Sequence, residues 1–496
     1  MKFDLTPKKF SELQVEALVV YVFEKETELK GTIRDVDRVT GGLITSLLST
    51  KELTGKPFEY AYARNPEGLQ AKRIFVFGAG KKETFDLGQL RKLAGAIART
   101  LRSKSILNFA LLKRSAFDSA GAAQAVVEGI ILAHFDIDRY KTDNEPKNPI
   151  QTVLLAGGDQ ARKPAILQAI ERGRIVAEAQ NFARELINEP SNKLTPTHLA
   201  ERASVMAREF DLRIEILERE DMEKLGMGAL LSVARGSEEP PKLIVLTYDP
   251  QGVEHPSKTI GLVGKGITFD TGGISLKPPE GMEKMKYDMS GAASMIAVMR
   301  ALALLKPKVK VIAMVPTTEN MPGGRAQKPG DVQTSMSGKT IEVINTDAEG
   351  RLVLSDAIAY VKKLGATHLI DMATLTGAVS IALGDVRVGV MGNHQKWMNA
   401  FLRAAEECGE KMWQLPMDEE YGDLIKSKIA DLKNTGGRYA STITAAKFLE
   451  VFAGDTPWIH LDIAGTEWLE EAKPYCSEGP TGIGIRSVIQ TVCTQR

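Results

Sequence analysis

Short apolar runs rich in β-branched residues alternate with segments of helical periodicity along the chain. This alternation is typical of α/β folds, in which a mostly parallel or mixed sheet is flanked by helices. In the first third we expect strands at residues 17–23, 73–77 and 151–155, and helices at 87–101 and 119–132. Further along we expect strands at residues 242–247, 259–264, 309–315, 368–372 and 458–461, and a buried helix at 292–305.

A long helical pattern at residues 163–188 separates the two groups of strands and ends before Pro190. We interpret it as a connector helix that joins two α/β domains, with the domain boundary near residue 170. The N-terminal domain then covers residues 1–170 and the C-terminal domain residues 171–496. Thr195 before Pro196 predicts a helix start, and the polar segment 136–149 predicts a surface loop.

Composition narrows the class of protein. The 496 residues include 64 Lys and Arg against 63 Asp and Glu, and 43% are hydrophobic. These values exclude a disordered chain and a strongly basic nucleic-acid binder. Three cysteines without a CxxC pair favour a reducing compartment, and the apolar run at 17–23 is too short to cross a membrane. We therefore expect a cytoplasmic protein with no membrane partner.

Several common catalytic motifs are absent from the sequence. No histidine begins a His-Glu-x-x-His motif, and no Gly-x-Ser-x-Gly elbow is present. Residues 337–340 resemble the end of a phosphate-binding loop, but Gln333 stands where its first glycine is required. The glycine pairs at 78–80 and 264–266 both lack the third glycine of a dinucleotide-binding loop.

Four acidic residues lie at predicted strand-to-helix junctions of the second domain: Asp270, Asp288, Asp347 and Glu349. Taken singly, Asp288 could interact with a helix dipole and Asp347 could cap a helix. Four converging carboxylates would repel one another, and divalent cations such as Mn, Mg or Zn relieve such repulsion. The set is large enough for a two-metal site, and only six histidines in the chain fit a site built from carboxylates.

The segment Asn345-Thr346-Asp347-Ala348-Glu349-Gly350-Arg351-Leu352 resembles the signature octapeptide of the leucyl aminopeptidase family, the cytosol aminopeptidases. The resemblance extends over residues 188–192, 263–278, 285–293, 319–322 and 329–332. The first 170 residues resemble the N-terminal domain of that family only loosely. The resemblance implies a catalytic C-terminal domain and an N-terminal domain with a role in oligomerisation or regulation.

The resemblance also implies roles for individual residues. Two zinc or manganese ions would be held by Lys265, Asp270, Asp288, Asp347 and Glu349, with Asp270 and Glu349 bridging them. Lys277 would polarise the scissile carbonyl, and Arg351 would hold a bicarbonate anion that acts as general base. Without the resemblance, we would interpret Lys265 as a residue that binds an anion and Lys277 as a solvated loop lysine. Arg351 would be interpreted as the ion-pair partner of a neighbouring carboxylate.

The implied reaction is removal of the N-terminal residue from peptides with a free amino terminus, preferably a leucine-like residue. An apolar pocket for its side chain would be formed by Met285, Thr374, Leu375 and Gly377. The implied assembly is a homohexamer. Ser290 and Ser441 depart from the family pattern, because many relatives have glycine at both positions.

Two other functions stay open from the sequence. A carboxylate-rich site would also suit a two-metal phosphoesterase. A DNA-binding or regulatory role could use Arg91, Arg99 and Arg102, although these residues are more simply explained as the solvated face of a helix.

Overall fold

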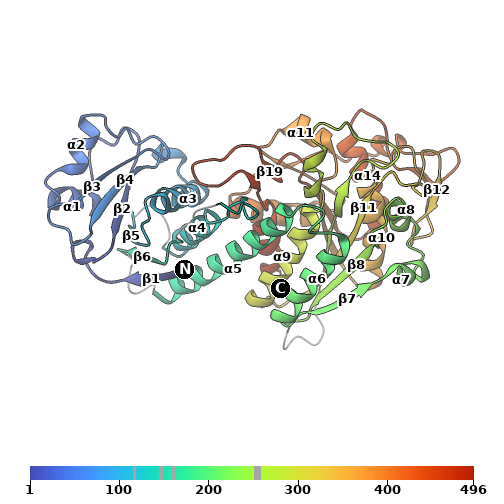
Figure 1. Cartoon of the computed structure of the whole chain (residues 1–496), viewed down its shortest axis with the longest axis horizontal. Helices are drawn as coiled ribbons and strands as arrows, with labels where there is room; N and C mark the ends of the chain where they lie inside the picture. The colour runs from blue at the N-terminus through green and yellow to red at the C-terminus, as the bar shows by residue number, and fades with distance from the viewer. Residues whose placement is uncertain (115–118, 144–148, 158–162, 251–257, 496) are drawn as a thin grey trace. The chain divides into compact units, whose positions relative to one another are not determined.

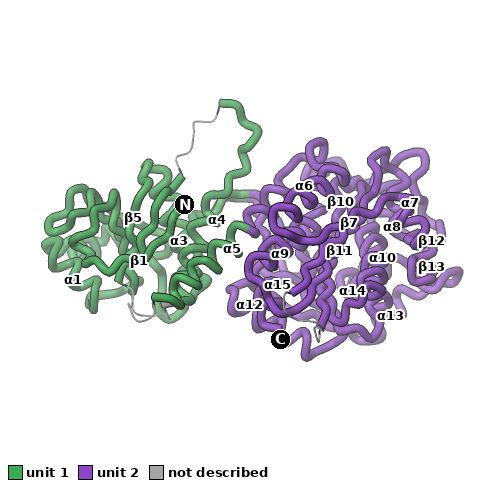
Figure 2. The backbone as a smooth tube through the Cα atoms, turned by 90° about the horizontal axis from the view of Figure 1, so that it is seen from below, with its two compact units in different colours: residues 1–178, 471–478 green, residues 179–470, 479–496 purple. Residues whose placement is uncertain are grey.

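The computed structural model describes residues 1–114, 119–143, 149–157, 163–250 and 258–495. These residues form two compact units, one of residues 1–178 and 471–478 and the other of residues 179–470 and 479–496 (Figure 2). Helix α5 (Lys163–Asn188) has the predicted bounds and runs through the division. The boundary that we predicted near residue 170 lies inside this helix, and nothing in the sequence predicted that residues 471–478 belong to the first unit.

The first unit is built on a six-stranded sheet with the order β1-β6-β5-β2-β4-β3, parallel except for β3 (Figure 1). Alternate residues of β2 face two different cores. Val19 packs with α3 and α4, whereas Val20 packs with α1 and α2. Both faces of the sheet are therefore covered, which explains why β2 reads as a continuous apolar run. The elements are β1 (Lys2–Thr6), β2 (Ala17–Val22), α1 (Thr32–Val39), α2 (Leu43–Ser49), β3 (Tyr60–Arg64), β4 (Arg73–Gly78), α3 (Leu87–Ser103), β5 (Asn108–Leu112), α4 (Ser119–Leu132) and β6 (Thr152–Ala156).

Two arginines of α3 are held by acids inside the first unit. Arg91 Nε lies 2.6 Å from a carboxylate oxygen of Glu128, and Arg102 Nη2 lies 2.6 Å from one of Asp136. Both arginine side chains are mostly buried. The interpretation of these two residues as a solvated helix face is therefore wrong, and neither is free to contact a phosphate backbone.

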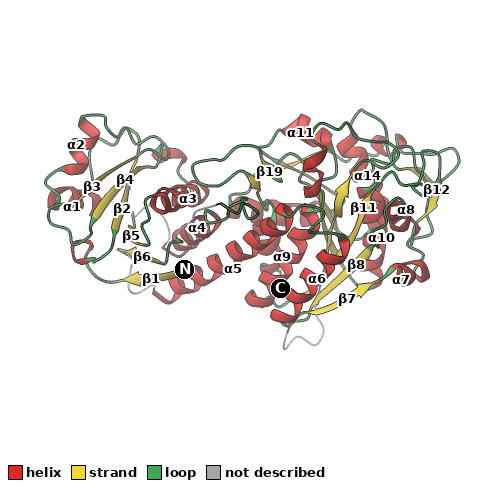
Figure 3. Ribbon diagram, viewed as in Figure 1, coloured by secondary structure: helices red, strands yellow, loops and turns green. Residues whose placement is uncertain are grey.

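The second unit contains a nine-stranded sheet with the order β16-β15-β18-β14-β9-β11-β8-β7, and β10 pairs with β11. Figure 3 labels its strands β11, β8 and β7. Its central strands β18, β14, β9 and β11 are parallel, so their carboxyl ends meet at one edge, where ligand sites of α/β sheets form. The strands are β7 (Arg213–Leu217), β8 (Lys242–Tyr248), β9 (Thr259–Gly264), β10 (Gly266–Asp270), β11 (Lys310–Asn320), β14 (His368–Ala373), β15 (Val388–Gly392), β16 (Met412–Gln414) and β18 (Trp458–Asp462).

Helices cover both faces of this sheet. Helix α9 packs against β9, β11 and β14, while α10 and α14 join the sheet in a separate large core. The segment 282–305, which includes α9, is long and apolar enough to cross a membrane, but 78% of its most apolar stretch is buried in the fold, as in the core helix of a soluble protein. The helices are α6 (Pro196–Glu209), α7 (Arg219–Lys224), α8 (Gly228–Ala234), α9 (Ser290–Leu305), α10 (Gly350–Lys363), α11 (Gly377–Leu383), α12 (Gln395–Cys408), α13 (Glu420–Asp423), α14 (Ser441–Ala453) and α15 (Ile485–Cys493).

The structure confirms the predicted α/β class and corrects some element bounds. Strand β13 (Thr340–Glu342), which was not among the expected strands, pairs with β12 (Val332–Thr334) and β17 (Leu432–Lys433) in a small sheet. A two-stranded sheet joins β19 (Trp468–Leu469) to β20 (Gly479–Pro480). Thr195 caps α6 as predicted. Of the predicted loop 136–149, residues 144–148 lie outside the described residues and the others form no helix or strand.

Candidate functional site

The site lies in the second unit, at the carboxyl ends of the central parallel strands. Lys265 lies between β9 and β10, and Asp270 is the last residue of β10. The Lys265 backbone amide donates to the Met372 carbonyl at the end of β14, and its own carbonyl accepts from Ala292 in α9. Lys265 is thus fixed at the junction of two strands and a helix, beside a cavity of about 790 Å³.

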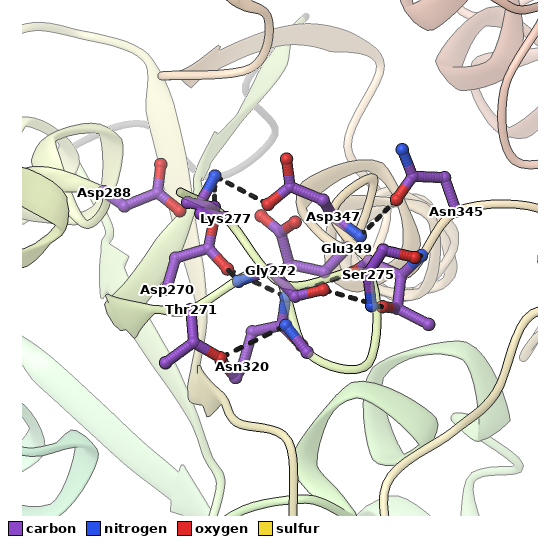
Figure 4. Close-up of polar contacts among 12 residues, drawn as sticks. Asp270, Thr271, Gly272, Ser275, Lys277, Asp288, Asn320, Asn345, Asp347 and Glu349 are labelled. Carbon is purple, nitrogen blue, oxygen red and sulfur yellow. Dashed lines mark hydrogen bonds and ion pairs between the residues drawn. The ribbon is translucent and has the colours of Figure 1, made fainter. Parts of the chain in front are cut away.

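Three of the four predicted carboxylates form a tight group. Asp270, Asp347 and Glu349 each offer one oxygen, and these atoms lie within 4.8 Å of one another (Figure 4). Asp347 and Glu349 come from the irregular segment that leads into α10. Asp288 ends the 3-10 turn Met282–Tyr287, just before α9. All four acids line the same cavity, as the sequence predicted.

Two lysines pair with these acids. Lys265 Nζ lies 2.8 Å from Asp288 Oδ1 and 2.8 Å from Glu349 Oε1. Lys277 Nζ lies 2.8 Å from Asp270 Oδ2 and 2.6 Å from Asp347 Oδ1. Two ammonium groups face four carboxylates, so the cluster carries excess negative charge when all six groups are ionised.

The titration behaviour of the cluster reflects this imbalance. Burial raises the pKa of Asp288, and the Lys265 charge only partly opposes it. Burial, with the charge of Asp270 added, also raises the pKa of Asp347 and of Glu349. For Lys265, burial would lower the pKa, but the neighbouring carboxylates outweigh burial and raise it. The site therefore favours added positive charge.

Unpartnered oxygens in the cluster fit divalent cations. Asp288 Oδ2 and Glu349 Oε2 are buried and accept no hydrogen bond from the described residues. Buried carboxylate oxygens without a partner are costly, and coordination of a hard or borderline cation satisfies them. The donor set of four carboxylates and one amine suits Mn or Zn.

Other side chains orient the acids. Asn320, which ends β11 beside Asp270, donates from Nδ2 to Asp270 Oδ1 at 2.8 Å. Thr374 donates from its hydroxyl to Asp288 Oδ1 at 2.6 Å. Hydrogen bonds of this kind fix the direction of a metal ligand. We assigned no role to Asn320 from the sequence, although it lies in one of the segments that resemble the family.

The alternative interpretation of Asp347 as a helix cap is wrong. Helix α10 begins at Gly350, its N-cap residue is Glu349, and no side chain caps it. Helix α9 begins at Ser290 after Met289, also without a side-chain cap. Both acids are directed to the cluster.

Arg351 lies in the first turn of α10 and is almost completely buried. Its Nη1 donates to the Asn434 carbonyl at 2.8 Å, and its Nε has no hydrogen-bond partner among the described residues. Burial lowers the pKa of Arg351 to about 10, against the charges of Glu349 and Asp462. Within the described part of the chain Arg351 makes no ion pair, which contradicts its interpretation as the partner of a neighbouring carboxylate.

The predicted pocket residues Met285, Thr374, Leu375 and Gly377 all line the cavity. Ser441 lines it as well, whereas Ser290 is buried and donates to the Tyr287 carbonyl at 2.5 Å. The cavity wall also contains Glu467, a buried acid that the sequence did not single out. Its position could be recognised only once the segment after β18 was placed beside the carboxylate cluster.

Two models of known protein domains match most of the chain. A model of the catalytic domain of the cytosol aminopeptidase family matches residues 181–489, and a model of its N-terminal domain matches residues 19–144. A probable cytosol aminopeptidase of Solibacter usitatus is 49% identical over 98% of both chains. That of Koribacter versatilis is 47% identical over 99% of both.

Solved structures agree with these matches. A mutant of tomato leucine aminopeptidase has a TM-score of 0.89 and 31% identity, covering 100% of this chain and 97% of its own. The bottromycin maturation enzyme BotP in complex with Mn has a TM-score of 0.85 and 31% identity, and the match covers 97% of this chain and 99% of the BotP chain. The chain therefore belongs to the cytosol aminopeptidase family and is an aminopeptidase of the leucine aminopeptidase type.

Proposed function

We propose that this aminopeptidase works with two divalent ions, Mn or Zn, bound in the carboxylate cluster. Asp270, Asp347 and Glu349 would hold one ion, and Lys265 and Asp288 would hold the other together with Asp270 and Glu349. The observation that carries the proposal is the convergence of three carboxylate oxygens within 4.8 Å beside buried, unpartnered oxygens of Asp288 and Glu349. Such ions activate a bound water and polarise a carbonyl.

Lys265 has to lose a proton to act as a ligand, because an ammonium group has no lone pair. In the structure its ammonium group pairs with Asp288 and Glu349. Displacement of this proton by a metal makes binding weaker at low pH, as for other metal sites with protonated ligands.

Lys277 is assigned to the scissile carbonyl. Burial would lower its pKa, but Asp270, Glu349 and Asp347 together raise it, so the side chain stays a cation at neutral pH. It is partly exposed to the cavity and fixed by two carboxylates. A fixed cation beside the carbonyl oxygen stabilises the negative charge that develops there during hydrolysis.

Arg351 is assigned to a bicarbonate anion that takes the proton from the attacking water. Arg351 lines the cavity, and its buried Nε has no hydrogen-bond partner among the described residues. A planar guanidinium binds a planar oxyanion well. Among the described residues that line the cavity there is no histidine, and the family resemblance assigns this role to a bound base.

The substrate is a peptide with a free amino terminus, whose amine would bind at the metals. Met285 and Leu375 give the cavity apolar wall suited to a leucine-like side chain. We further propose that the protein is a cytoplasmic homohexamer in which the N-terminal domain, residues 1–170, serves assembly or regulation.

The test compares three substrates after the protein has been stripped with a chelator and reloaded with Mn or Zn. Leucinamide should be hydrolysed only by the reloaded protein, and N-acetyl-leucinamide should resist because its amine is blocked. Turnover of p-nitrophenyl phosphate in place of leucinamide would show a two-metal phosphoesterase. Full leucinamide turnover by the stripped protein would contradict the proposed mechanism.

A further inference from the structure

Glu467 is an acid in the wall of the substrate cavity that the proposed mechanism does not use. Its side chain is buried, with 4% of the residue exposed, and Oε2 accepts no hydrogen bond from the described residues. The residue shares the cavity with the metal cluster and with the pocket residue Met285. A buried carboxylate oxygen without a hydrogen-bond donor carries a desolvation cost.

The backbone holds Glu467 firmly. Its amide donates to the Ile463 carbonyl at 3.1 Å, and its carbonyl accepts from the Thr481 amide at 2.8 Å. The preceding residues Ala464 and Gly465 also line the cavity. The backbone of Glu467 is therefore fixed in the cavity wall by hydrogen bonds.

Among the described residues, no lysine or arginine is one of the main influences on the charge of this acid. Burial raises the pKa of Glu467 to about 7, and the charge of Asp462 acts in the same direction. Hydrogen bonds from the backbone amides of residues 465–467 oppose this shift. The main influences on the pKa of Glu467 include no lysine or arginine, although Arg351 and Arg438 also line the cavity. The charge of Glu467 in turn raises the pKa of Tyr287. The cations Lys265 and Lys277 are paired with the metal-binding acids.

We propose that Glu467 is a specificity-determining residue that receives the positively charged end of an N-terminal lysine or arginine side chain. The apolar wall around Met285 would pack on the methylene stem, and Oε2 would accept a hydrogen bond from the ammonium or guanidinium group. The pocket then accepts basic as well as leucine-like residues. This inference rests on the proposed aminopeptidase site, because it assigns one wall of that site.

The test uses lysyl and norleucyl p-nitroanilides, whose side chains have the same stem and differ in the terminal ammonium group. The ratio of their kcat/KM values, measured with the Mn-loaded protein, isolates the contribution of the charge. We expect Glu467→Gln to lower the lysyl-to-norleucyl ratio by about 10- to 100-fold, the range for loss of a charge-assisted hydrogen bond. Glu467→Met should shift the preference further toward norleucine.

Glu470→Gln is the matched control. Glu470 is an acid three positions further along, exposed and paired with Lys284 at 2.8 Å, and its substitution should leave the ratio unchanged. Melting temperatures report whether each variant is folded. An unchanged ratio in Glu467→Gln, or an equal loss toward both substrates, would overturn the inference.

The two proposals fail in different ways. A wild-type protein that cleaves the norleucyl substrate and not the lysyl one refutes the role of Glu467 but leaves the aminopeptidase site intact. A reloaded wild-type protein that cleaves neither refutes the proposed function itself.

Discussion

Substitution of Gly350 by alanine tests whether the position of Lys265 matters for catalysis. A Cβ atom at Gly350 would lie 2.6 Å from Lys265 Cε and 2.9 Å from Lys265 Nζ. Nonbonded carbon atoms prefer about 3.5–4.0 Å, so the end of the lysine side chain has to retreat by roughly 1 Å. A retreat of that size breaks its contacts with Asp288 and Glu349, each 2.8 Å long.

The fold should tolerate this change. Gly350 begins α10 with ordinary helical backbone, and alanine is favoured over glycine in a helix by about 1 kcal/mol. The contact is with the flexible end of a side chain and not with backbone. We therefore expect an unchanged or slightly higher melting temperature together with a loss of about 100-fold in kcat, since a misplacement of about 1 Å can cost that much.

The assay is leucinamide hydrolysis at saturating Mn, with thermal melting measured on the same samples. Gly422→Ala is the control, because Gly422 also lies in a helix, α13, and a Cβ there would meet only Lys447 Cε at an ordinary 3.6 Å. Full activity in Gly350→Ala would refute the role assigned to Lys265. A similar loss in Gly422→Ala would show that the effect is not specific to the site.

Four further predictions address stability, metal binding, pH and the general base. Asp356 accepts from the buried amides of Leu230 and Met336 at 2.9 and 2.7 Å; Asp356→Asn turns an NH₂ group toward one of them and should lower the unfolding free energy by about 1–3 kcal/mol in chemical denaturation, with activity retained. Saturating the stripped protein with Mn to about 100 times its Kd should raise stability by about 2.7 kcal/mol for each bound ion, and an unchanged melting temperature in calorimetry would count against the metal site. Burial raises the pKa of Glu467 to about 7, so its negative charge is lost as the pH falls below that value; the lysyl-to-norleucyl ratio should rise from about pH 6 to about pH 8, and a flat profile in the wild type would contradict the proposed pairing. Arg351→Met should lower kcat about 100-fold or more, the usual contribution of a general base, and should abolish the response to bicarbonate added to carbonate-free buffer.

The sequence predicted the layers of the fold well where apolar runs are fully buried. Strand β2 packs on both faces and was predicted within one residue. The edge strand β3 was missed because its side chains alternate between exposed and partly exposed positions.

More of the site was predicted than the spacing of acidic residues alone would allow, because the octapeptide resemblance assigned roles to residues such as Lys265 and Arg351. Residues that act through tertiary contacts were not predictable in this way. Asn320 reaches Asp270 only because β11 and β10 pair side by side. Glu467 joins the cavity from a segment about 200 positions after Lys265, and no local pattern marks it as buried.

The most direct test of the central claim is the number of metal ions bound per chain, measured by elemental analysis alongside leucinamide turnover. The carboxylate cluster predicts two Mn or Zn ions per wild-type chain, with turnover lost when they are removed. Asp347→Asn should bind fewer ions and lose turnover. Full turnover by a metal-free chain, or an unaltered metal content and activity in Asp347→Asn, would contradict the account.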